Sequence, residues 1–78
     1  MEELLQKVIA KVYQLNQKTE HDIFLNFIGH INAVEIYYYK NGFEKDNHKV
    51  SIMDFTENLT ENNLKKALEK LEELGKEN

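Results

Sequence analysis

The feature that most constrains the fold is a change of hydrophobic periodicity that occurs twice along the chain. Apolar residues recur every three or four positions in residues 2–17 and again in residues 60–75. This spacing places them on one face of an α-helix. Between these segments, residues 21–39 and 49–55 are rich in β-branched and aromatic residues, which is typical of β-strands. The pattern therefore predicts strands enclosed between two helices.

The two predicted helices each carry an apolar stripe, and the second also carries end signals. In the first helix the stripe is Leu4, Leu5, Val8, Ile9, Val12 and Leu15. Thr60 is a suitable N-cap for the second helix, and Leu59 before it can pack on Leu64 as a hydrophobic staple. Gly75 is a stop signal for the end of that helix.

Three strands are expected, at residues 21–28, 33–39 and 49–55. Gly29 and Asn32 in the first connection can adopt positive φ, and Asn41-Gly42 is a strong turn signal in the second. Three antiparallel strands expose an apolar face that two helices can cover. We therefore expect residues 1–78 to form a single α+β domain, a two-layer sandwich of a helix, a three-stranded antiparallel sheet and a helix (αβββα).

Composition limits the location and the partners. The 78 residues include no cysteine, which fits a reducing, cytoplasmic environment. The chain opens with Glu2 and Glu3 rather than with a basic signal, and no apolar run reaches the roughly 18 residues that a membrane span needs. All 10 basic residues are lysines and the net charge is -4. Because arginine is the usual residue for phosphate and guanine contacts, we expect no nucleic-acid partner. The lack of a membrane span leads us to expect no membrane partner.

Alternation divides the strand residues between the two faces of the sheet. The set predicted to form the core beneath the helices is Ile23, Leu25, Phe27, Val34, Ile36, Tyr38, Val50 and Ile52. The set predicted to face away is Phe24, Asn26, Ile28, Glu35, Tyr37, Tyr39, Ser51, Met53 and Phe55. A bulge at Gly29 or Asn32 would exchange the two sets.

The second set is apolar for a solvated sheet face, which is normally polar. Its large members form the predicted interaction face: Phe24, Ile28, Tyr37, Tyr39, Met53 and Phe55. Aromatic residues and methionine are enriched at protein interfaces. Two functions follow, a module that binds another protein or a structural homodimer that uses this face. The alternative is that the helix edges or residues 41–48 cover the face, or that the tyrosines are ordinary surface residues.

Catalytic, cofactor and metal sites find little support. His21 and His30 fall at opposite ends of one strand, about 30 Å apart, and His48 lacks the short paired spacing of zinc ligands. We expect all three to be surface histidines. Ser51, the only serine, lies within a strand and lacks the Gly-x-Ser-x-Gly setting. A protein that is not an enzyme, with no cofactor, is the expectation, and a small enzyme or metal-binding protein is the minor alternative.

Residues 21–32 (HDIFLNFIGHIN), with Tyr39-Lys40-Asn41-Gly42-Phe43, carry a resemblance to known proteins. They resemble small, uncharacterised proteins encoded by phages and prophages of Gram-positive bacteria. In that pattern an amphipathic helix precedes a strand that ends near Gly-His-x-Asn, and a second strand ends in glycine and an aromatic residue. The resemblance implies a phage accessory factor that binds a host protein, and it assigns no functional residue.

Overall fold

The computed structural model describes residues 1–40 and 49–76. The elements follow in the order α1 (Glu2–Lys18), β1 (Asp22–Ile28), the short 3-10 helix η1 (Gly29–Ile31), β2 (Ala33–Tyr39), β3 (Lys49–Met53) and α2 (Glu61–Lys76). The predicted α+β order of helix, three strands and helix is confirmed. The turn predicted at Asn41-Gly42 lies outside the described residues.

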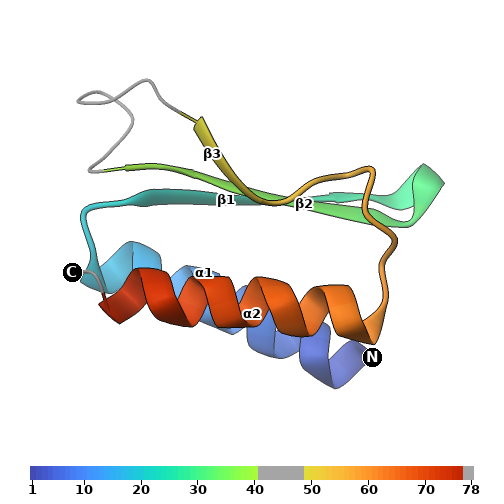
Figure 1. Cartoon of the computed structure of the whole chain (residues 1–78), viewed down its shortest axis with the longest axis horizontal. Helices are drawn as coiled ribbons and strands as arrows, with labels where there is room; N and C mark the ends of the chain where they lie inside the picture. The colour runs from blue at the N-terminus through green and yellow to red at the C-terminus, as the bar shows by residue number, and fades with distance from the viewer. Residues whose placement is uncertain (41–48, 77–78) are drawn as a thin grey trace.

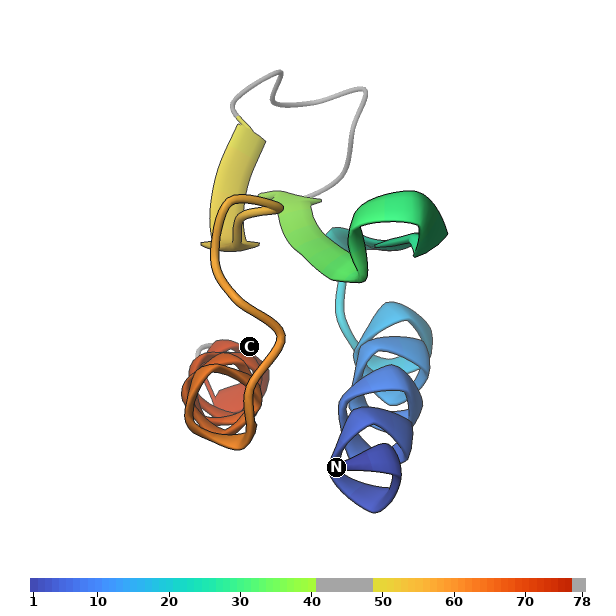
Figure 2. The same cartoon turned by 90° about the vertical axis from the view of Figure 1, so that its right-hand side faces the viewer.

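The three strands form one antiparallel sheet with β2 in the centre. Both helices lie on one face of this sheet, side by side (Figures 1 and 2). The pairing of β1 with β2 is regular from Asp22 opposite Tyr39 to Ile28 opposite Ala33. Asn32, between η1 and β2, has a φ of 50°, so one of the two residues predicted to allow positive φ in this connection adopts it.

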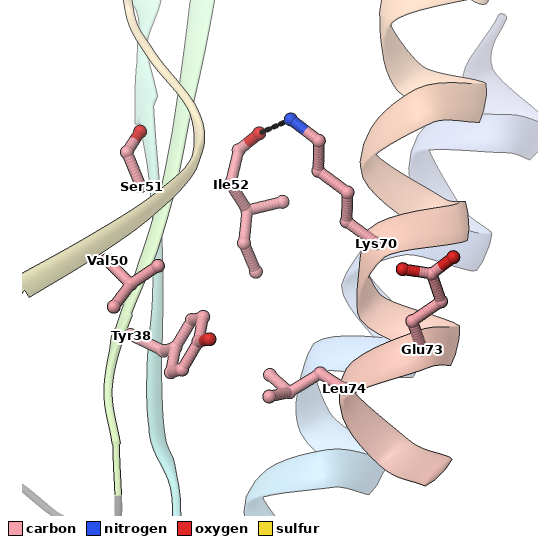
Figure 3. Close-up of a pocket in the computed structure, with 7 residues that line it drawn as sticks. All are labelled: Tyr38, Val50, Ser51, Ile52, Lys70, Glu73 and Leu74. Atoms are coloured by element: carbon pink, nitrogen blue, oxygen red, sulfur yellow. Dashed lines mark hydrogen bonds between the residues drawn. The ribbon is translucent and has the colours of Figure 1, made fainter. Parts of the chain in front are cut away.

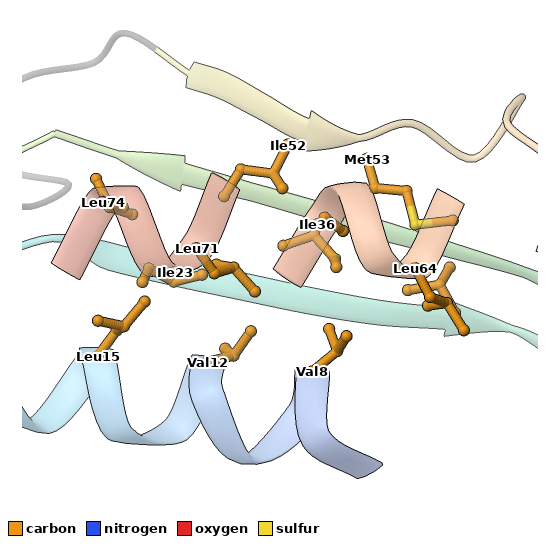
Figure 4. Packing of buried hydrophobic residues seen from close by; sticks show 12 residues of the cluster. Val8, Val12, Leu15, Ile23, Ile36, Ile52, Met53, Leu64, Leu71 and Leu74 are labelled. Carbon is orange, nitrogen blue, oxygen red and sulfur yellow. The ribbon is translucent and has the colours of Figure 1, made fainter. Parts of the chain in front are cut away.

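The core fills the space between the sheet and the helices (Figure 4). Its fully buried large residues come from both layers: Ile36, Met53, Leu64, Leu71, Val8 and Val34. Burying a side chain of this size contributes about 1.5–3 kcal/mol relative to leaving it exposed. The amphipathic stripes of α1 and α2 therefore hold the two layers together, although Ile9, predicted to belong to the α1 stripe, is exposed.

A β-bulge in β3 changes the predicted sorting of the faces. Ile36 pairs with Met53 while Tyr37 pairs with Ser51, so Ile52 is an extra residue on β3. Ile52 and Met53 consequently both point toward the helices (Figure 4), and Met53 is 0% exposed. The prediction that Met53 lies on the face away from the core is wrong, because a bulge reverses the alternation of the residues that follow it.

Two further residues at strand ends depart from the predicted positions. Phe27 pairs with Val34 on the helix side of the sheet, but it is 54% exposed because it lies near the end of an edge strand. There it borders a shallow pocket with Leu5 and Leu59 instead of entering the core. Strand β3 ends at Met53, so Phe55 lies in the turn beyond the sheet and is exposed.

The start of α2 agrees with the prediction from the sequence, and its end does not. Thr60 caps the helix, since its Oγ1 accepts a hydrogen bond from the Asn63 N–H at 3.2 Å. Gly75 lies inside α2, which continues to Lys76, so the predicted stop at Gly75 is wrong. A Cβ at this position would lie 2.9 Å from Leu15 Cδ2. Glycine at position 75 therefore permits the close approach of α2 to α1.

Candidate interaction face of the sheet

The sheet face that points away from the helices carries three aromatic rings in contact. Phe24 and Tyr37 lie directly opposite each other on β1 and β2, and their rings stack with centroids 5.2 Å apart and planes 10° apart. Tyr39 meets both rings edge-on, at 5.9 Å from Phe24 and 6.1 Å from Tyr37. We call Phe24, Tyr37 and Tyr39 the aromatic cluster. Such arrangements are the favoured geometries of aromatic pairs.

Alternation along the strands explains why these rings share one face. Ile23 and Ile36 point into the core between the sheet and the helices. Their neighbours Phe24 and Tyr37 must then point the other way. Neither α1 nor α2 lies on that side (Figures 1 and 2). Phe24 is 40% exposed and the two tyrosines are half-buried, so the cluster presents aromatic surface on this face.

A polar network lies beside the aromatic cluster. The Lys49 Nζ is 4.2 Å from the centroid of the Tyr37 ring and 3.7 Å from Glu35 Oε2. The Asn26 side-chain amide donates a hydrogen bond to Glu35 Oε1 at 3.3 Å. Each contact of this exposed kind contributes about 1 kcal/mol or less. The main effect of this network is to pair the charge of Lys49 with that of Glu35. This face of the sheet therefore combines aromatic rings with polar side chains whose charges cancel.

Only some residues of the predicted interaction face therefore lie together in the structure. Phe24, Tyr37 and Tyr39 form one cluster, and Ile28 is half-buried at the other end of β1. Met53 belongs to the core and Phe55 lies beyond the sheet. The predicted face omitted Lys49. Its place opposite Tyr39 depends on the β2–β3 register, which local sequence patterns do not specify.

The histidines are placed differently from the prediction. His21 is 4% exposed, so its assignment as a surface histidine is wrong. Its ring packs edge-on against Tyr38 with centroids 5.4 Å apart, and its backbone N–H donates to Thr19 Oγ1 at 3.2 Å. This turn between α1 and β1 buries the ring, a consequence of tertiary packing. His30 is exposed, and His48 lies outside the described residues.

A shallow pocket of about 180 Å³ lies between β3 and α2 (Figure 3). The Lys70 Nζ donates a hydrogen bond to the Ile52 carbonyl at 3.2 Å, across the gap between these two elements. Ser51 and Glu73 also line the pocket, and none of its described lining residues is a histidine. The pocket is smaller than typical ligand sites.

Within residues 1–40 and 49–76, no three His, Asp or Glu side chains gather where they could hold a metal ion. Neither described helix has the length and apolar character needed to cross a lipid bilayer.

The chain matches no family model, and comparisons with curated proteins and with solved structures give no match either. The resemblance of residues 21–43 to phage-encoded proteins therefore stays a prediction.

Proposed function

We propose that this protein is a non-enzymatic interaction module that binds another protein through the aromatic cluster. The observation that carries the proposal is the contact of Phe24, Tyr37 and Tyr39 on a sheet face without a covering helix among the described residues. Rigid aromatic side chains bury much area at low cost in conformational entropy, and they dominate many binding hot spots. A phage accessory factor that binds a host protein is the setting that the resemblance implies.

A structural homodimer is the second candidate. Lys49 and Glu35 neutralise each other within one chain, so two copies of this face carry little charge repulsion between them. Sheet-on-sheet packing is a common way to bury two such faces. In that case dissociation and unfolding become coupled, and the midpoint of thermal unfolding rises with protein concentration.

The solution mass decides between the two candidates. Light scattering coupled to size exclusion should give the 9.3 kDa mass of one chain from low to high micromolar concentration if the face serves a different protein. A mass of twice that value, lost in the double variant Phe24→Thr/Tyr37→Thr, would instead assign the face to the homodimer.

The same double variant tests the interaction module. Threonine keeps the β-propensity of the strands while it removes the stacked rings. We expect a host protein captured by the wild-type chain to be lost with Phe24→Thr/Tyr37→Thr and retained with Gln14→Asp, a change at an exposed position of α1. Equal capture by both variants, each shown by circular dichroism to be folded, would exclude the aromatic cluster as the binding surface.

A further inference from the structure

Among residues 1–40 and 49–76, a side chain bonds to the outer edge of β1 at Ile23 alone. The Asn16 side-chain amide of α1 donates to the Ile23 carbonyl at 2.9 Å, and its oxygen accepts from the Ile23 N–H at 2.8 Å. A residue on a neighbouring strand would make this same pair of hydrogen bonds. Since the N–H and C=O of one strand residue point to the same side, the backbone groups of Ile23 point away from β2.

Alternation then gives the direction of the remaining backbone groups of β1. Leu25 and Phe27 present their N–H and C=O to the same outer edge as Ile23. In the described part of the chain, no hydrogen bond reaches these outward groups of Leu25 or Phe27. Strand β1 also lacks the proline, lysine or bulge that commonly protects a sheet edge.

The opposite edge of the sheet is protected. Strand β3 has 5 residues against 7 in β1, and it contains the bulge at Ile52. It begins with Lys49, and the Lys70 side chain bonds to the Ile52 carbonyl. These are the usual means of preventing a further strand from pairing. The β1 edge is therefore the one open to strand addition.

An apolar surface accompanies the open edge. Asn16 shows which flank of α1 lies beside β1, and Ile9 and Tyr13 share this flank because they precede Asn16 by seven and three positions. Ile9 is 47% exposed and Tyr13 is 67% exposed. Two helices side by side, each about 10 Å wide with its side chains, cover about 20 Å, which matches the width of four strands at about 4.8 Å spacing better than that of three. A fourth strand beside β1 would cover this flank.

The charges near this edge are acidic. Glu2 precedes Ile9 by seven positions and so lies on the same flank of α1. By contrast, Lys11 and Lys18 line a pocket on the other side of the helix, next to α2. A strand that binds here gains from positive charge at its ends.

We propose that an extended segment of another protein binds the β1 edge as a fourth strand. Its backbone bonds to the outward groups of Leu25 and Phe27, and alternate apolar side chains pack on Ile9 and Tyr13. A lysine or arginine at one of its ends lies near Glu2. In strand addition of this kind, the backbone hydrogen bonds provide affinity and the contacts of alternate side chains provide specificity.

A second copy of this chain fits the β1 edge poorly. Helix α1 lies beneath the β1 side of the sheet (Figure 2). Pairing β1 with β1 of a second copy at strand spacing would bring two α1 helices closer than the 8–10 Å that helix packing requires. The occupant we propose therefore has no helix on this side.

The test uses a fluorescein-labelled probe of 7 residues, the length of β1, with the sequence Lys-Val-Thr-Val-Thr-Val-Lys. We expect saturable binding by fluorescence polarisation, with a Kd of about 100 µM or tighter. N-methylation of one alternate set of probe residues should abolish binding, and methylation of the other set should leave it intact. Replacing both lysines by glutamate should weaken it.

Matched protein variants locate the site. Ile9→Lys should weaken probe binding by about tenfold or more, whereas Gln14→Lys, the same charge change on another flank of α1, should leave it unchanged. Tyr37→Thr should also leave it unchanged, because Tyr37 lies on the central strand β2 and not beside the outer edge of β1. No binding by the wild-type chain, or equal effects of Ile9→Lys and Gln14→Lys, would overturn the proposal. So would an Ile9-dependent dimer, which would make a second copy the occupant.

Discussion

The two faces of the sheet carry large apolar side chains under different conditions. On the helix side, Ile36 and Met53 are enclosed between two layers and touch core residues from both helices and strands. On the other side, Phe24 and Tyr37 contact mainly their neighbours along the sheet. The first set is therefore expected to hold the fold together, while the second set is expected to contribute little to stability, in keeping with the recognition role that we propose for it.

The largest expected effect comes from removing a side chain on the helix side. Ile36→Ala should lower the free energy of unfolding by about 2–5 kcal/mol, because it leaves a cavity in a core that cannot fully collapse. Phe24→Ala on the other face should cost about 1 kcal/mol or less, mostly from the lost ring contact. Urea denaturation followed by circular dichroism measures both. Equal losses would remove the distinction between the faces.

A smaller effect is expected where α1 is attached to the sheet. Asn16→Ala removes both hydrogen bonds to Ile23 and should cost about 1–2 kcal/mol. Gln17→Ala, next to it on the exposed surface of α1, is the control and should change the free energy of unfolding by less than about 0.5 kcal/mol. The same denaturation experiment compares them. If Asn16→Ala lowered the free energy of unfolding no more than the control did, the Asn16–Ile23 hydrogen bonds would not stabilise the packing of α1 on the sheet.

The smallest effect is expected for the polar network on the sheet face that points away from the helices. Lys49→Met removes the ion pair with Glu35 and the cation over the Tyr37 ring, and it should cost about 0.5–1 kcal/mol. Because exposed ion pairs are screened by salt, this difference should shrink when the NaCl concentration rises from about 0.05 to 1 M. A decrease in the free energy of unfolding above about 2 kcal/mol would mean that this polar network stabilises the fold as much as a core side chain does.

Part of the candidate face was predictable from local pattern. Alternation along β1 and β2 placed Phe24, Tyr37 and Tyr39 on one side, because that pairing is regular over its whole length. The same rule failed on β3, where the bulge moved Met53 into the core. The extra residue at Ile52 produces no signal in the composition. Met53 was therefore misplaced because the β2–β3 register was wrong, although Met53 does belong to a strand.

What the sequence by itself determined is the order of elements and the stripes that join the layers. Val8, Val12 and Leu15 follow the helical period, and Thr60 marks the start of α2, because these signals depend only on neighbours along the chain. Only the tertiary structure decided the burial of His21 and the exposure of Phe27. Both depend on which element covers a side chain, and that is set by packing between segments distant in sequence.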